Sequence, residues 1–183
     1  MEFVKSFKQT RLIKLLFFAL VGSIFLAISS KIKIPFYPVP MTMQTFVVIF
    51  IGIAFGWKLA VATISLYLFE GMIGLPVFSG SPEKGVGLAY FMGPTMGYLI
   101  GFIVAAYTAG IFTYDNNLVK NFLKLTFATS FIYILGMLWL GNLIGWEKPI
   151  FKLGAQPFLI AELFKILIAT LTINQIKKLR KFI

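Results

Sequence analysis

Two residues of opposite charge, Glu162 and Lys165, stand three positions apart inside an apolar segment, residues 157–176. A spacing of three places both side chains on one face of a helix. Ionisable groups inside a membrane-length apolar segment are expensive, and they usually face a bundle interior or a water-filled cavity with a partner. We therefore predict a binding site at this pair. The alternative is a purely structural ion pair near the outer membrane surface.

Further polar residues are expected at a similar depth in other apolar segments, and together they would form a pocket open to the outside. Each has a plainer explanation, because interfacial tyrosines anchor helices and a buried glutamine often bonds only to a neighbouring helix. These residues are Thr42, Gln44, Glu70, Tyr90 and Tyr98.

The chain has no Cys and no His. This absence excludes disulfides, thiol nucleophiles, zinc sites built on those ligands, and the commonest general base. An intramembrane enzyme acting on lipid would need Glu70 and Glu162 as paired carboxylates, without a nucleophile or a metal-ligand cluster beside them. We predict no catalytic residue, no metal site and no cofactor.

Two loops rich in proline and glycine adjoin the predicted pocket, at residues 35–40 and 74–82. Three prolines in six residues restrict the first loop to an extended path, and the Gly/Pro/Ser run of the second can bring backbone close to a ligand. We expect the loop around Pro38 to Pro40 to act as a lid. Simple tight connections are the alternative.

The elements that carry these residues are predicted to be membrane-spanning helices in a single domain, residues 1–183. The chain is 59% hydrophobic and 13% charged, whereas globular domains carry about a quarter charged residues. A soluble protein would expose too many of the 21 Phe side chains, so the expected solvent is lipid. We predict an all-α integral membrane protein with six spans, at Leu12–Ser30, Thr42–Phe55, Leu59–Ile73, Ala89–Phe112, Phe122–Ile144 and Pro157–Ile176.

The uncertain boundary is near Lys58, because Met41 to Phe69 could also form one long helix. With six spans, eleven basic residues lie inside (Lys5, Lys8, Arg11, Lys14, Lys58, Lys120, Lys124, Lys177, Lys178, Arg180 and Lys181) and five outside (Lys31, Lys33, Lys84, Lys148 and Lys152). With five spans the counts are seven inside and eight outside. The positive-inside rule favours six, with both termini in the cytoplasm. A Lys58 in mid-bilayer would also cost about 2.5 to 3.5 kcal/mol.

The net charge of +11 does not indicate nucleic-acid binding, because the basic residues gather at the termini and in short loops. The sequence contains no GxxxxGK[ST] loop, so any ATP hydrolysis would belong to a partner.

On the first helix, Ala19, Ser23 and Ala27 recur every four residues and form a flat strip where another helix can approach closely. Packing inside the bundle explains this strip as well as a partner does.

Four short sequence motifs resemble those of the BioY family, the biotin-specific substrate-binding components of energy-coupling factor transporters. They run in order through most of the chain, at residues 38–45 (PVPMTMQT), 74–80 (GLPVFSG), 93–99 (GPTMGYL) and 157–165, where Pro157-Phe158 leads through Glu162 to Lys165. The family position of Glu162 is more often Asp, so the carboxylate is kept and its reach differs by one methylene.

This resemblance implies six helices in a prokaryotic plasma membrane and capture of biotin from outside. It also implies association with a membrane-embedded coupling subunit, facing the Ala19 strip, and with two cytoplasmic ATPases. Glu162 would accept from the ureido N–H groups of biotin, and Lys165 would donate to the ureido carbonyl. Ser79, Ser81 or Lys84 would bind the valerate carboxylate, and Phe78 or Tyr90 would contact its chain. Capture of another vitamin and an autonomous secondary carrier are the alternatives.

Overall fold

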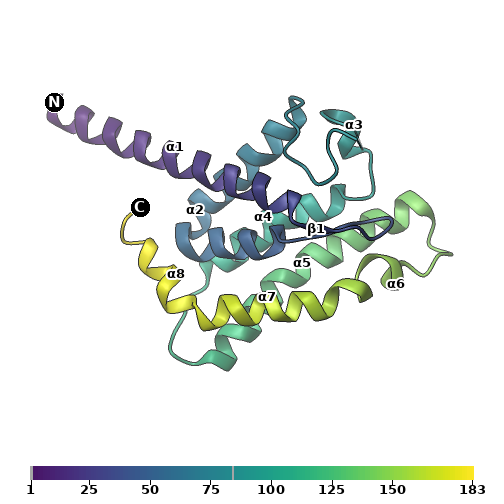
Figure 1. Cartoon of the computed structure of the whole chain (residues 1–183). Helices are drawn as coiled ribbons and strands as arrows, with labels where there is room; N and C mark the ends of the chain where they lie inside the picture. Colours follow the sequence, from purple (N-terminus) through teal and green to yellow (C-terminus); the bar gives the residue numbers. More distant parts are fainter. Residues whose placement is uncertain (1, 84) are drawn as a thin grey trace.

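The computed structural model describes residues 2–83 and 85–183, with side chains from Arg11 onward. It is a helical bundle with one small hairpin of strands (Figure 1). The elements are α1 (Glu2–Lys31), β1 (Lys33–Ile34), β2 (Met41–Thr42), α2 (Gln44–Met72), α3 (Leu88–Phe91), α4 (Met96–Ile111), α5 (Leu118–Ile144), α6 (Ile150–Gly154), the 3₁₀ helix η1 (Gln156–Phe158), α7 (Leu159–Leu171) and α8 (Ile173–Leu179).

Several of these helices have the length and composition of membrane spans. Among the described residues four apolar stretches qualify, at Arg11–Lys31, Gln44–Met72, Leu118–Ile144 and Ile150–Leu171, and Met96–Ile111 is a shorter apolar helix. Large apolar side chains also cover the outer surface; Phe17 of α1 is 61% exposed and Phe164 of α7 is 62% exposed. Such a surface requires lipid as its solvent. The chain is therefore a multi-pass membrane protein.

Helix α2, for which the sequence allows either one long helix or two shorter ones, folds back on itself. Gly56 interrupts the helix with φ +72° and ψ 164°, a backbone conformation that glycine adopts without a Cβ clash. Gln44 Nε2 donates to Tyr67 Oη at 2.7 Å, although 23 residues of straight helix would hold these residues about 35 Å apart. The two halves of α2 therefore form a helical hairpin with Gly56 at its turn, and Lys58 is exposed beside that turn.

The predicted segment Ala89–Phe112 is divided in the structure. It contains the short α3, a turn at residues 92–95 and then α4. Trp139 of α5 donates its indole N–H to the carbonyl of Gly93 at 2.9 Å and holds this turn. The last predicted segment is likewise divided, since α7 ends at Leu171 and α8 begins at Ile173.

The core forms where α4 packs between α2 and α5. Small residues recur every four positions along α4, at Gly97, Gly101, Ala105 and Ala109, and this spacing permits close helix approach. A Cβ on Gly101 would lie 2.6 Å from the Cα of Ile132 on α5. Because the obstacle is backbone, no larger side chain fits there. The tight α4–α5 contact fixes one wall of the site described next.

Candidate functional site

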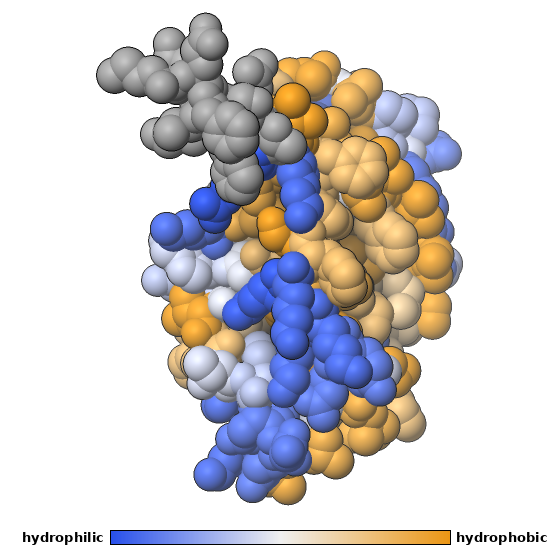
Figure 2. Space-filling view, turned by 90° about the vertical axis from the view of Figure 1, so that its left-hand side faces the viewer, coloured by the Kyte–Doolittle hydropathy of each residue, from blue (hydrophilic) through white to orange (hydrophobic). Residues whose placement is uncertain are grey.

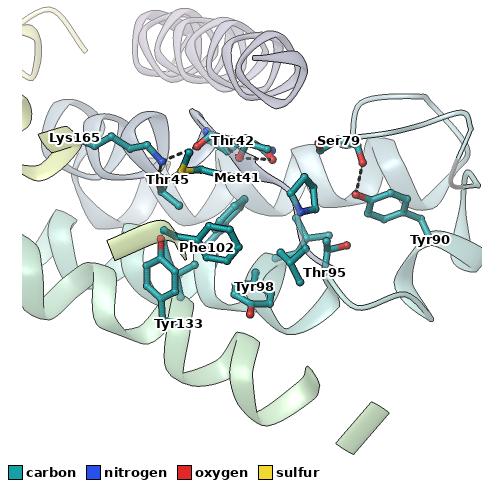
Figure 3. A pocket seen from close by; sticks show the side chains of 16 residues that line it. Met41, Thr42, Thr45, Ser79, Tyr90, Thr95, Tyr98, Phe102, Tyr133 and Lys165 are labelled. Atoms are coloured by element: carbon teal, nitrogen blue, oxygen red, sulfur yellow. Dashed lines mark hydrogen bonds between the residues drawn. The ribbon is translucent and has the colours of Figure 1, made fainter. Parts of the chain in front are cut away.

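A cavity lies between the hairpin β1–β2 and the helices α2, α4, α5 and α7 (Figure 3). Its wall combines aromatic rings with a few polar groups, as small-molecule sites do. The lining residues are Val39, Pro40, Met41, Thr42, Gln44, Thr45, Ser79, Tyr90, Thr95, Tyr98, Leu99, Phe102, Ile132, Tyr133, Phe158 and Lys165.

One end of the cavity carries a buried network of charged and hydroxyl groups around Lys165. Its Nζ donates to the carbonyl of Thr42 at 2.7 Å, to Thr45 Oγ1 at 2.9 Å and to Glu162 Oε2 at 3.3 Å. Thr45 and Tyr133 each donate a hydroxyl to the same carboxylate oxygen at 2.8 Å. Pairing and hydrogen bonding of this kind make burial of both charges tolerable.

The other oxygen of Glu162, Oε1, is buried without a hydrogen-bond partner. Glu162 does not itself line the cavity; it lies directly behind Thr45, Tyr133 and Lys165, which do. A buried carboxylate oxygen without a donor is costly. The network therefore offers one unused acceptor close to the cavity wall.

Ser79 lies at the opposite end of the cavity from Lys165 (Figure 3). Its carbonyl accepts a hydrogen bond from Tyr90 Oη at 2.7 Å, while its buried Oγ has no partner. The backbone around Ser79 is held by Lys31, at the end of α1, whose Nζ donates to the carbonyls of Pro76, Phe78 and Ser81 at 2.8, 3.0 and 3.1 Å.

The other predicted residues either line the cavity or stand behind its wall. Thr42, the last residue of β2, and Gln44, the first residue of α2, line the cavity. The backbone N–H of Gln44 donates to Thr42 Oγ1 at 3.3 Å. Tyr98 lines it too, and its hydroxyl donates to the carbonyl of Gly154 at 2.8 Å. Phe78 stands behind the wall instead, 1% exposed and stacked on Tyr90 with ring centroids 4.7 Å apart.

Glu70 is not part of the cavity. Ser23 on α1 donates to Glu70 Oε1 at 2.8 Å, so this carboxylate links α1 to the second half of α2, apart from Glu162. Ser81 is not part of the cavity lining either, and its Oγ donates to the carbonyl of Phe78 at 2.7 Å. The third predicted loop donor, Lys84, falls outside the described residues.

The small-residue strip on α1 packs within the chain. Ala19 and Ser23 are buried, at 6% and 1% exposure, and Ala27 packs partly buried against the core. A Cβ on the adjacent Gly22 would lie 2.6 Å from Thr63 Cγ2 of α2. In this conformation the strip packs α1 against α2, which agrees with the explanation that it is used for packing inside the bundle.

Sequence reasoning does not single out Tyr133 or Thr45 as site residues. A tyrosine in the middle of an apolar helix is a usable signal, because a buried phenol hydroxyl needs a partner. Thr45 directly follows the predicted Gln44, one position further along the helix.

Among the described residues no group of three or more His, Cys, Asp and Glu side chains could hold a metal ion.

Known proteins resemble this chain in sequence. A sequence model of the BioY family matches residues 4–182. The probable biotin transporter BioY of Pyrococcus horikoshii is 34% identical over 76% of this chain and 81% of its own. The biotin transporter BioY of Thermotoga maritima is 32% identical over 84% of this chain and 90% of its own.

A solved structure has the same fold. The crystal structure of the S-component for biotin from an ECF-type ABC transporter superposes with a TM-score of 0.74 at 25% identity, covering 94% of this chain and 93% of the other. The family match extends over almost the whole sequence, and two relatives exceed 30% identity over most of both chains. This chain therefore belongs to the BioY family.

Proposed function

We propose that this chain captures biotin outside the membrane and mediates its uptake as the substrate-binding component of an energy-coupling factor transporter. As a BioY family member it is a transport protein and not an enzyme. The observation that carries the proposal is the buried Lys165, Thr45 and Glu162 network at one end of an aromatic cavity. It combines an ammonium donor with a free carboxylate acceptor.

The ureido ring of biotin matches this chemistry, because it has one carbonyl acceptor and two N–H donors. Lys165 would donate to the carbonyl, and the unused Oε1 of Glu162 would accept from an N–H after a small shift of the wall. All three ammonium hydrogens of Lys165 are already used, so the ligand replaces one partner. We infer that the ligand replaces the carbonyl of Thr42, because this residue belongs to the hairpin and the other two partners belong to helices of the bundle.

The hairpin β1–β2 then acts as the lid. Its tip, residues 35–40, supplies Val39 and Pro40 to the cavity wall. The cavity measures about 50 Å³, below the roughly 300 Å³ at which ligand pockets usually begin. Biotin therefore enters only when the lid moves outward. Release of the Thr42 carbonyl from Lys165 would couple this movement to recognition of the ureido ring.

The valerate end of biotin would point toward Ser79. In this orientation the free Ser79 Oγ donates to the carboxylate, and the apolar chain lies against Tyr90 and Tyr98. Phe78 supports this wall from behind by stacking on Tyr90.

The membrane arrangement that fits this function has six crossings with both termini in the cytoplasm. The reversal at Gly56 turns α2 into two of these crossings, and the Lys165 end of the cavity lies below the outer membrane surface. Uptake would require a membrane-embedded coupling subunit and two cytoplasmic ATPases, because the chain has no phosphate-binding loop of its own.

Equilibrium binding of biotin to the detergent-purified chain tests the proposal, with riboflavin and thiamine as competing ligands. We expect tight binding of biotin alone. Replacing Lys165 by Met should weaken it about 10- to 100-fold, since hydrogen bonds to a charged group are worth roughly 1.5 to 3 kcal/mol. Lys152→Met, on the exposed surface of α6, is the matched control.

Folding of each variant is checked by gel filtration and far-ultraviolet circular dichroism. Preferential binding of riboflavin or thiamine would identify another vitamin as the substrate. Uptake by cells that lack the ATPase partners would indicate a secondary carrier. Wild-type affinity in both Lys165→Met and Glu162→Gln would remove this network from the binding site.

A further inference from the structure

A second concave surface lies at the end of the molecule where both termini are found, far from the lid. It is an apolar groove of about 450 Å³ between the first half of α1 and the turn of α2. Figure 2 views this end of the molecule, where hydrophilic side chains border an apolar surface. The groove is lined by Arg11, Leu12, Leu15, Leu16, Ala19, Phe55, Lys58, Leu59, Ala62, Arg180 and Ile183.

Three cations from distant parts of the chain line this one groove, namely Arg11, Lys58 and Arg180. All three are exposed, and none of the described lining residues is acidic. Three like charges around one concave surface repel each other, and an anion at their centre removes that cost. The groove is therefore electrostatically complementary to an anionic ligand.

Arg180 is held in place by the fold and still has hydrogen-bond donors to spare. Its Nη2 donates to the carbonyls of Gly52 and Gly110 at 3.3 and 3.1 Å, which stand in the last turns of two helical segments. A guanidinium carries five N–H donors. The three N–H groups on Nε and Nη1 of Arg180 therefore remain available for a ligand. Their orientation is fixed in advance, which favours a phosphate group.

The apolar wall of the groove is nearly as long as one leaflet of the hydrocarbon core is thick. From Arg11 to Ala19 the α1 wall extends about 12 Å at 1.5 Å per residue, and half of the hydrocarbon core measures about 15 Å. Free phosphate would use only the three cations. A molecule with both a phosphate and an acyl chain uses the cations and the walls together.

We propose that this groove binds one anionic phospholipid from the leaflet that contains both termini. The phosphate lies among Arg11, Lys58 and Arg180, and one acyl chain lies along Leu12, Leu16 and Leu59. The bound lipid fills the space between α1 and the α2 turn, so it stabilises the packing of α1 against the bundle.

Native mass spectrometry of the detergent-purified full chain tests this site, with phosphatidylglycerol and phosphatidylcholine of identical acyl chains as probes. We expect one phosphatidylglycerol to be retained in clear preference to phosphatidylcholine. The double variant Arg11→Gln/Lys58→Gln should lose roughly 25-fold in affinity, about fivefold for each cation near an anionic lipid. Lys148→Gln/Lys152→Gln removes the same charge from the opposite end of the molecule and should leave retention unchanged.

A second variant separates the groove from general charge attraction. Ala62→Phe fills the groove from an exposed position on α2 and keeps all three cations. It should lower phosphatidylglycerol retention and leave biotin binding at the wild-type level. Equal retention of both lipids by the wild type, or full retention by Ala62→Phe, would overturn the proposal. Loss of coupling-subunit binding in these variants, without any lipid retention by the wild type, would overturn it too and assign the groove to a protein helix.

Discussion

Lys165 uses all three ammonium hydrogens inside the protein, on Thr42, Thr45 and Glu162. Two polar atoms near the cavity remain without partners, Glu162 Oε1 and Ser79 Oγ. Buried polar groups in folded proteins are nearly always hydrogen-bonded, so unsatisfied ones need an explanation. The two atoms stand at opposite ends of the cavity, and a ligand with polar groups at both ends would satisfy them together.

The Ser79 hydroxyl should contribute to ligand affinity and not to folding. In Ser79→Ala we expect biotin affinity to fall about 5- to 10-fold, the value of one hydrogen bond. The melting temperature without ligand should stay the same or rise, because an unsatisfied buried hydroxyl is removed. Calorimetric titration and thermal unfolding measure the two effects.

Ser29→Ala is the matched control, because Ser29 is buried as well and its Oγ donates to the carbonyl of Leu26 at 2.8 Å. Unchanged biotin affinity in Ser79→Ala would remove the serine from the proposed carboxylate site.

At the level of elements, two segments that are not helical position the site. The hairpin β1–β2, which we propose as the lid, pairs Lys33 with Thr42 and Ile34 with Met41. The loop of residues 76–81 presents Ser79, and it is tied to the last residue of α1 by Lys31. Both segments depend on a few long-range contacts, which makes them sensitive to single substitutions.

Replacing Lys31 by Met should loosen the loop that presents Ser79. The change removes a donor from three backbone carbonyls, so we expect biotin affinity to fall about tenfold and loop amides to exchange faster. Hydrogen-exchange mass spectrometry over residues 74–83 measures the second effect. Lys33→Met, on the exposed β1 strand, is the control, and equal exchange in both variants would contradict the role of Lys31.

The lid should open more easily when its aromatic contact with the bundle is removed. Phe36 packs edge-to-face on Phe158 with centroids 5.7 Å apart, and such pairs are worth about 0.5 to 1.5 kcal/mol. In Phe36→Ala we expect biotin to dissociate roughly 2- to 10-fold faster, as measured by chase of labelled biotin. Tyr37→Ala is the control, because Tyr37 is 91% exposed; an equal effect there would argue against this contact as the latch.

At the scale of the whole molecule, the proposed six crossings depend on the reversal of α2 at Gly56. It puts the start and end of α2 side by side, as the bond from Gln44 to Tyr67 requires. Lys58 then lies exposed at the turn, and with the proposed six crossings this turn would stand at the membrane surface. The same turn brings Lys58 next to Arg180 in the groove at the termini.

Labelling of single cysteines should report this topology directly, since the chain has no cysteine of its own. With six crossings, a membrane-impermeant maleimide applied to intact cells should label Lys148→Cys. It should label Asn116→Cys and Lys178→Cys only after permeabilisation. The reverse pattern would indicate five crossings. All three positions are exposed, so accessibility differs only through the membrane.

Much of this protein is determined by local features of its sequence. Long apolar segments predicted the membrane protein because backbone groups in lipid must be satisfied within helices. The three-residue spacing of Glu162 and Lys165 placed both on one face of α7, and the two loops marked by proline and glycine do adjoin the cavity. These conclusions need only helix geometry and the cost of burying charge.

Only the tertiary structure decided which residues meet across the bundle. Tyr133 reaches Glu162 from α5, Phe78 turns behind the wall to stack on Tyr90, and Ala19 packs within the bundle. The distribution of basic residues predicted a break between Phe55 and Leu59, and the structure shows that the chain reverses at Gly56, with Gln44 in contact with Tyr67. Each of these features depends on residues far apart in the sequence, and local patterns carry no information about such pairs.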